Sequence, residues 1–90
     1  YLINSAKSWQ EAKTYLDSNE PDLILLDVKL PDANGLDLLK ELAQQLPTIL
    51  LTAYGSVQNA VTAMQRGAAD YLMKPINIQE LELVIERVLE

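Results

Sequence analysis

The sequence predicts an α/β fold, in which helices cover both faces of a parallel β-sheet. Short, continuous apolar runs such as residues 23–26 and 49–51 have the pattern of strands that are buried on both faces. Segments with helical periodicity separate these runs, and such alternation favours parallel strands joined by right-handed crossovers. Three runs in succession end at a polar residue, Asp27, Thr52 or Lys74. Because parallel strands end at a common edge, we expect these three side chains to lie together.

The first part of the chain predicts one short strand and one helix. Residues 1–3 have strand character, and Ser8 with Glu11 has the spacing of a capping box, which satisfies free N–H groups at a helix start. A helix is therefore expected to about Asp17. Pro21 lies beyond it, so the next strand should begin at residue 22 or 23. The inner stripe of the helix is expected to consist of Trp9, Ala12 and Leu16.

Residues 22–35 are the stretch around which the rest is organised. Four apolar residues end abruptly at Asp27, and turn residues follow at Pro31 and Asn34. Position alone leaves two interpretations open, because Asp27 could be a reactive group at the sheet edge or could simply cap a turn after the strand. A helix follows, with an apolar stripe formed by Leu36, Leu39, Ala43 and Leu46.

The second half repeats the alternation of strand and helix. Pro47 ends the preceding helix, and residues 48–53 predict a buried strand. Ser56 is a candidate N-cap, and Gly67 is placed to close the next helix at its C-terminal end. The buried side of that helix is expected to contain Val57, Ala60, Val61 and Met64.

The last strand is expected at residues 71–73, before Lys74 and Pro75. Asn77 and Glu80 form a second capping-box pattern, which predicts a helix to the end of the chain. Its buried residues should be Ile78, Leu81, Ile85 and Val88, with Glu80, Glu82, Glu86 and Glu90 in solvent.

Composition excludes several classes of function. Ninety residues with 49% hydrophobic content indicate one small globular domain. A net charge of −6 and seven scattered basic residues argue against direct nucleic-acid binding. The absence of Cys and His rules out zinc sites, thiol nucleophiles and imidazole catalysis. No apolar run approaches the roughly 20 residues of a membrane span, and no signal peptide opens the chain, so we expect a cytoplasmic protein.

A carboxylate, a hydroxyl and an ammonium at one edge suit phosphoryl capture better than acyl transfer. An oxygen of Asp27 would attack phosphorus, Lys74 would pair with a phosphoryl oxygen, and Thr52 would donate a hydrogen bond. Such a site also needs Mg²⁺, for which Asp27 alone is a poor site. A small-molecule α/β enzyme has little support, since no general base or cofactor loop is evident.

Two other motifs are rejected on their spacing. Asp32, Asn34, Gly35 and Glu41 match later positions of a Ca²⁺-binding EF-hand loop, but the first ligand position would be Leu30. The glycines do not form a dinucleotide or P-loop fingerprint. They are expected at turns and helix ends.

Three motifs together resemble the receiver domains of two-component response regulators. Residues 25–31, with Gly35 and Leu36, resemble the strand and loop that carry the phospho-acceptor. Residues 51–53 resemble the strand that carries the switch hydroxyl. Residues 70–75 resemble the final signature of the family. The run 52–68 is most similar to receivers of sigma-54-dependent activators of the nitrogen-regulation type. The resemblance to receiver domains implies a flavodoxin-like doubly wound parallel sheet with strand order 2-1-3-4-5.

The resemblance also implies a role for individual residues. Asp27 would accept the phosphoryl group from a phosphohistidine on a sensor histidine kinase, and the backbone carbonyl of Lys29 would be a metal ligand. Thr52 and Lys74 would hold the phosphoryl oxygens, and Tyr71 would be the aromatic switch that follows Thr52. Taken singly, each has a simpler interpretation: Thr52 as a strand former, Tyr71 as half-buried core and Lys74 as a solvated turn residue.

The final signature of the family further implies a cis peptide bond between Lys74 and Pro75. Phosphorylation would favour one of two pre-existing arrangements of the surface formed by residues 56–90. The expected partners are the kinase and a downstream effector domain that binds DNA. A homodimer through residues 56–90, or by strand exchange, is a further expectation.

The chain departs from the family at its start. A receiver begins with a strand and helix that are not seen here, and that strand carries the acidic pair for Mg²⁺. Residues 1–90 would then be a partial receiver, with strands 2 to 5 and helices 2 to 5 of the family fold.

Three cases remain open: the missing unit precedes these residues in a longer protein, a second chain replaces it, or this piece folds differently. Limited to these residues, we expect weak or absent Mg²⁺ binding and negligible phosphorylation. The alternative function is a phosphate-independent pseudo-receiver, or a truncated module for interaction or dimerisation.

Overall fold

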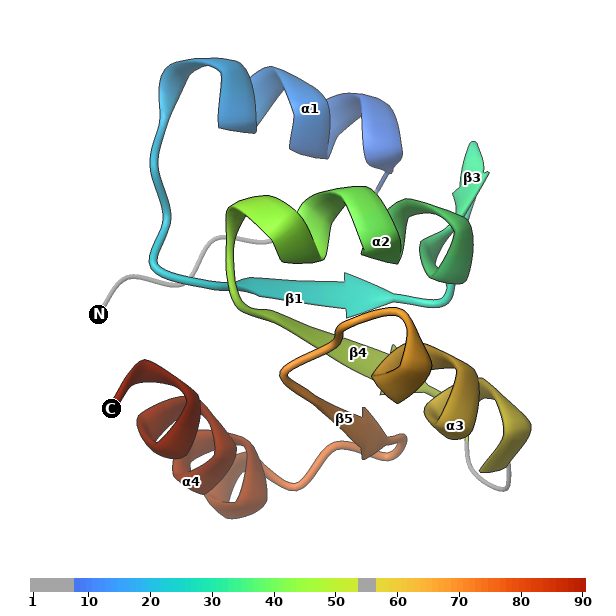
Figure 1. Cartoon of the computed structure of the whole chain (residues 1–90), viewed down its shortest axis with the longest axis vertical. Coiled ribbons are helices and arrows are strands. Elements are labelled where there is room, and N and C mark those ends of the chain that lie inside the picture. The colour runs from blue at the N-terminus through green and yellow to red at the C-terminus, as the bar shows by residue number, and fades with distance from the viewer. Residues whose placement is uncertain (1–7, 54–56) are drawn as a thin grey trace.

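A computed structural model describes residues 8–53 and 57–90, and its elements are shown in Figure 1. The expected strand at residues 1–3 and the expected cap at Ser56 lie outside the described residues. The helices are α1 (Trp9–Ser18), α2 (Gly35–Gln45), α3 (Val57–Gln65) and α4 (Ile78–Leu89). The strands are β1 (Ile24–Asp27), β2 (Lys29–Leu30), β3 (Ala33–Asn34), β4 (Thr48–Thr52) and β5 (Asp70–Met73).

The central sheet has three parallel strands in the order β1-β4-β5. Helix α2 connects β1 to β4, and α3 connects β4 to β5, so each parallel pair is joined through a helix. The register pairs Asp27 with Leu51, and Thr52 with Met73. The α/β class is therefore confirmed, and the three strands agree with the 3-4-5 part of the expected order.

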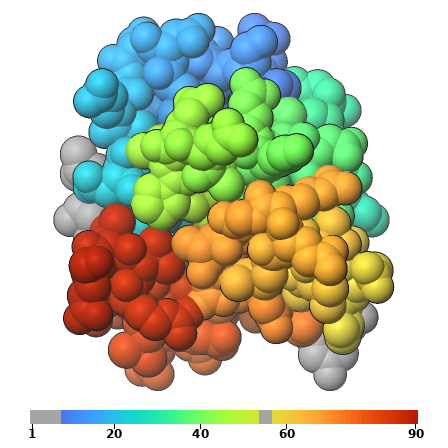
Figure 2. All heavy atoms as spheres, viewed as in Figure 1, coloured from blue at the N-terminus to red at the C-terminus, as the bar shows by residue number. Residues whose placement is uncertain are grey.

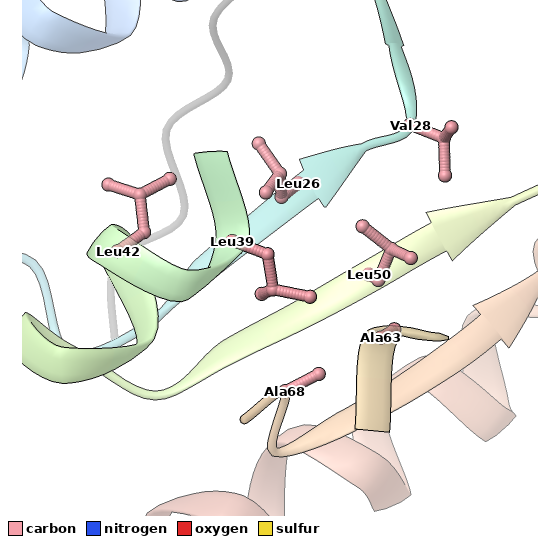
Figure 3. Close-up of a cluster of buried hydrophobic side chains, with 7 residues drawn as sticks. All are labelled: Leu26, Val28, Leu39, Leu42, Leu50, Ala63 and Ala68. Carbon is pink, nitrogen blue, oxygen red and sulfur yellow. The ribbon is translucent and has the colours of Figure 1, made fainter. Parts of the chain in front are cut away.

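Two apolar clusters lie on opposite faces of this sheet. On one face, Leu26 of β1 and Leu50 of β4 pack with Leu39 and Leu42 of α2. Figure 3 shows these side chains between α2 and the two strands. On the other face, Ile49 and Leu72 pack with α4; the buried residues of that cluster are Ile49, Leu72, Val84 and Ile85. Alternate residues of β4 thus serve both faces, which explains the continuous apolar runs.

Polar caps determine where the helices begin. The side chain of Ser8 accepts a hydrogen bond from Glu11 N at 3.1 Å, and that of Asn77 accepts one from Glu80 N at 3.1 Å, as the capping-box patterns predicted. Asn34 caps α2 by accepting from Leu36 N at 2.8 Å.

Gly67 ends α3 as expected. Its φ of +98° is readily accessible only to glycine, and its N–H donates to the Met64 carbonyl at 3.2 Å. The N–H of Ala68 donates to the Ala63 carbonyl at 3.0 Å, which completes a Schellman motif and satisfies two of the last carbonyls of the helix.

The predicted buried side of α3 is wrong in three of its four residues. Val57, Val61 and Met64 are 62%, 45% and 47% exposed, whereas Ala60 and Ala63 are buried. The helix is rotated so that its small residues face the sheet, and alanines allow its backbone to approach closely. A choice based on the largest apolar side chains therefore selected the outer side.

Helix α4 shows a smaller error of the same kind. Ile78 was expected to be buried but is 64% exposed at the first position of the helix, while Val84, which was not expected, is buried at 9%. Ile85 is fully buried as expected. Leu83, at 67% exposed, adds another large apolar side chain to the outer surface.

Candidate functional site

Asp27 ends β1 at the carboxyl edge of the sheet, and both of its carboxylate oxygens have partners. Oδ1 accepts a hydrogen bond from the backbone N–H of Lys29 at 3.1 Å, and Oδ2 forms an ion pair with Lys74 Nζ. The two side chains are 33% and 45% exposed, so the pair is open to solvent and to a ligand. The structure therefore joins the predicted acid and amine across 47 positions of sequence.

Thr52 lies at the same edge but makes a different contact. It is fully buried at the end of β4, one position beyond the residue paired with Asp27. Its hydroxyl donates a long hydrogen bond to the Ala53 carbonyl at 3.5 Å, and its own carbonyl accepts from Lys74 N at 2.7 Å. Within the described residues, the hydroxyl is not bonded to the carboxylate of Asp27 or the amine of Lys74. Its role as a phosphoryl ligand stays a prediction.

The peptide between Lys74 and Pro75 is cis, as the family signature implied. Lys74 follows β5 directly, and its side chain returns across the sheet edge to Asp27 while its backbone N–H is held by β4. Main chain and side chain together therefore fix the amine at the end of β1.

The loop after Asp27 folds into a small hairpin that the sequence analysis did not predict. Strands β2 and β3 pair antiparallel, with Lys29 opposite Asn34 and a turn at Pro31 and Asp32. Two-residue strands produce almost no alternation of polarity, so a proline-containing turn was the available signal. The hairpin directs the Lys29 backbone towards the Asp27 carboxylate.

Gly35 closes this loop against the strand that carries the acid. Its N–H donates to the Val28 carbonyl at 2.7 Å, and a Cβ at this position would collide with the backbone carbonyl of Asp27. Only glycine fits this close approach, and the glycine predicted from turn chemistry is therefore required by packing.

Asp32 makes contacts that the sequence did not predict. Its Oδ1 and Oδ2 accept hydrogen bonds from the backbone N–H groups of Trp9 and Gln10 at 2.8 and 2.9 Å. These bonds lower the pKa of Asp32 below its ordinary value, because N–H donors stabilise the charged form. The partners lie 23 and 22 positions away, so no local pattern reveals them; spacing drew attention to Asp32 only as part of a rejected EF-hand match.

Tyr71 is half-buried on β5, opposite Leu50 of β4. It packs against the apolar cluster that α2 and α3 share with the sheet. This position places it on the strand that contacts α3, the helix that follows Thr52, and its switching role stays a prediction.

The described residues do not form a complete site for Mg²⁺. Within residues 8–53 and 57–90, no three or more acidic, His or Cys side chains gather in a way that could hold a metal ion. Asp27 offers one carboxylate and is paired with Lys74, and Lys29 offers at most a carbonyl, as the resemblance implied. Mg²⁺ usually takes more carboxylate and water oxygens than these, so the described residues are at most part of a site.

Figure 2 shows the face on which α2 (green) and α3 (yellow to orange) lie side by side. Arg66, just after α3, joins them by donating to the Leu36 carbonyl at 2.6 Å and approaching the Asp37 carboxylate at 3.6 Å.

In the part of the chain that the structure describes, no helix has the length and apolar character to cross a membrane.

The sequence and the fold of this chain have clear counterparts among known proteins. A family model described as "Response regulator receiver domain" matches residues 1–86. The chain belongs to the response regulator receiver domain family, and the resemblance drawn from its motifs is confirmed.

Individual relatives agree with the expected nitrogen-regulation type. DNA-binding transcriptional regulator NtrC of Proteus hauseri is 46% identical over 77 residues, which are 82% of this chain and 16% of that protein. Regulatory protein LuxO of Vibrio cholerae is 39% identical over 90 residues, 97% of this chain and 20% of that protein. The chain thus spans a fifth or less of the length of these relatives.

Solved structures support the flavodoxin-like fold. The receiver domain of NtrX from Brucella abortus aligns with a TM-score of 0.89 at 33% identity, and covers 99% of this chain and 78% of that one. The receiver domain of the LuxO repressor protein from Vibrio parahaemolyticus aligns with a TM-score of 0.82 at 38% identity, over 93% of this chain and 67% of that one.

Proposed function

We propose that these residues belong to a phospho-accepting receiver, in which Asp27 takes a phosphoryl group from a phosphohistidine of a sensor kinase. The observation that carries the proposal is the pairing of the Asp27 carboxylate with Lys74 at the exposed carboxyl edge of the sheet. A carboxylate oxygen attacks phosphorus, the bond from phosphorus to the histidine nitrogen breaks, and the imidazole keeps the electron pair. The Lys74 ammonium is then placed to pair with an oxygen of the new acyl phosphate.

Mg²⁺ would be needed in addition to Lys74, because the transfer brings a dianionic phosphoryl group close to the Asp27 carboxylate and the repulsion between these negative charges must be offset. Since the described residues supply only part of its coordination, further acidic residues would have to come from elsewhere in the protein. A phosphorylated protein would therefore indicate that residues outside 8–53 and 57–90 complete the metal site.

The consequence of phosphorylation would be a shift of α3 and the surface that follows it. Phosphorylation adds about −1.5 to −2 charge beside the buried Thr52 hydroxyl, which can turn from the Ala53 carbonyl towards a phosphoryl oxygen. Tyr71 would move with it, as the family resemblance implies. Control of a DNA-binding effector domain, dimer formation and a cytoplasmic location are parts of the proposal that rest on relatives and resemblance.

The test is Asp27→Asn in the natural chain that contains these residues, incubated with acetyl phosphate and Mg²⁺ or with the phosphorylated kinase. Mass spectrometry of the intact protein should show an added phosphoryl group in the wild type and none in the variant. Asp22→Asn is the matched control, because it makes the same acid-to-amide change at an exposed residue just before β1. Equal labelling of Asp27→Asn and wild type would reject Asp27 as the acceptor. Lack of labelling in every protein would favour the phosphate-independent interaction module.

A further inference from the structure

Asp32 joins two elements that lie far apart in the sequence, helix α1 and the hairpin β2–β3. Helix α1 begins at Trp9, and the hairpin β2–β3 follows the acceptor Asp27. The Asp32 side chain lies at the turn of that hairpin and accepts hydrogen bonds from the first two N–H groups of α1. It is therefore an N-terminal cap supplied from a different element.

The four N–H groups at the start of α1 are all satisfied, but by two different sources. Trp9 and Gln10 donate to Asp32, Glu11 donates to the Ser8 hydroxyl, and Ala12 donates to the Ser8 carbonyl at 3.1 Å. Ser8 is local to the helix, whereas Asp32 is not. The two caps can therefore be removed separately, one affecting α1 alone and the other affecting both α1 and the hairpin.

The hairpin contacts the Asp27 carboxylate through the backbone of Lys29. Lys29, whose N–H donates to Asp27 Oδ1, pairs with Asn34 in the hairpin, and Gly35 N–H donates to the Val28 carbonyl. The base of the hairpin is thus fixed at Val28 and Gly35. Its turn, at Pro31 and Asp32, is attached to α1 through the Asp32 side chain.

We propose that Asp32 is a positioning residue that ties the hairpin to α1, so that the backbone holding the Asp27 carboxylate and the first turn of α1 move as one unit. This inference rests on the proposed function for its effect on phosphoryl transfer, but the tie itself can be measured without phosphorylation. The lowered pKa of Asp32 agrees with a carboxylate that is charged at neutral pH and held by N–H donors.

The first experiment measures the tie by hydrogen exchange and mass spectrometry in the natural chain. Asp32→Ala should speed exchange about tenfold in peptides from α1 and also in peptides covering residues 28–35, because both elements lose a fixed contact. Ser8→Ala is the matched control, and it should speed exchange in α1 alone. Asp32→Asn keeps one carbonyl oxygen as an acceptor and should lie between Asp32→Ala and the wild type.

The second experiment measures the rate of phosphoryl transfer from acetyl phosphate, a small donor that does not need a kinase surface. Asp32 does not touch the donor, so the maximal rate for Asp32→Ala should fall about tenfold while the half-saturating donor concentration stays unchanged. Ser8→Ala should match the wild type in both values, and Asp32→Asn should recover part of the maximal rate. A role limited to the stability of α1 would affect Asp32→Ala and Ser8→Ala alike.

The possible failures are distinguishable. If the exchange of residues 28–35 is the same in Asp32→Ala and Ser8→Ala, the tie does not exist and the inference is overturned. If that exchange differs but the maximal rates are equal, Asp32 does not position the acceptor and the inference is likewise overturned. If the wild type takes up no phosphoryl group, the proposed function fails, and the exchange data alone decide whether α1 and the hairpin are joined.

Discussion

Helices α2 and α3 cover the same face of the sheet, but they are anchored by very different side chains. Helix α2 inserts Leu39 and Leu42, which are 0% and 2% exposed, between the strands and the rest of the cluster. Helix α3 buries only Ala60 and Ala63 and turns its larger apolar side chains outward. A fully buried leucine removes far more apolar surface from water than an alanine does, so α2 is held much more strongly.

This difference agrees with the roles that we propose for the two helices. Helix α2 begins at Gly35, whose contact with the Asp27 backbone requires a fixed position, while α3 follows the strand that ends at Thr52. Segments with few buried apolar contacts open and shift at lower cost than the rest of a fold. A weakly anchored helix after Thr52 is therefore suited to respond to phosphorylation without disturbing the acceptor.

The largest expected effect comes from removing the anchor of α2. Leu39→Ala should destabilise the domain by about 2–5 kcal/mol, because it leaves a cavity at a fully buried position. Hydrogen exchange of peptides from α2, β1 and β4 in the natural chain measures this loss. Met64→Ala on α3 is the control, and its side chain is 47% exposed, so a change within about 0.5 kcal/mol is expected. Equal losses at the two positions would contradict the difference between the helices.

The next effect concerns the junction between α2 and the acceptor strand. Gly35→Ala should cost about 1–3 kcal/mol, because the new methyl group must displace the backbone at Asp27. Labelling with acetyl phosphate should also fall, since the carboxylate moves with that backbone. Gly67→Ala is a useful comparison, because it strains a positive φ at the end of α3 without touching Asp27. Loss of labelling in Gly67→Ala but not in Gly35→Ala would disprove the proposed importance of the Gly35 contact.

The same contrast explains how much could be predicted from the sequence. Strands β1, β4 and β5, helix α2 and the acid and amine pair were predicted, because continuous apolar runs and leucine spacing leave few alternatives. The inner side of α3 was not, because rules based on hydrophobicity favour valine and methionine over alanine. Alanine was selected there by the close approach of helix and sheet, which is a tertiary property.

The hairpin and the Asp32 bonds could not be predicted for a different reason. Strands of two residues have too little periodicity to detect, and a cap supplied from 23 positions away leaves no mark on the local sequence of α1. The Ser8 cap, by contrast, lies three positions from Glu11 and was found from spacing alone. Local hydrogen bonds are thus predictable, whereas those between elements require the fold.

A third, smaller effect should appear in acid. The pKa of Asp32 is lower in the folded protein than its ordinary 3.8, so its stabilising contribution is complete above that value and is lost as the pH falls through the folded pKa. The stability difference between wild type and Asp32→Asn should therefore be constant at neutral pH and should shrink below about pH 3.8. Hydrogen exchange or chemical denaturation at a series of pH values measures it. A difference that grows in acid would have the wrong sign.

The smallest effect is expected on the outer side of α3. Val61 is 45% exposed, so Val61→Ser should change stability by no more than about 0.5 kcal/mol. Ala63→Val, two positions away on the buried side, adds two methyl groups against the sheet and should cost about 1–3 kcal/mol, which makes it the matched contrast. Hydrogen exchange of peptides from α3 in the natural chain compares the two. If Val61→Ser were as costly as Ala63→Val, the outer side of α3 would be packed against another part of the protein or a partner. A helix held on both sides in that way could not be the weakly anchored element that responds to phosphorylation.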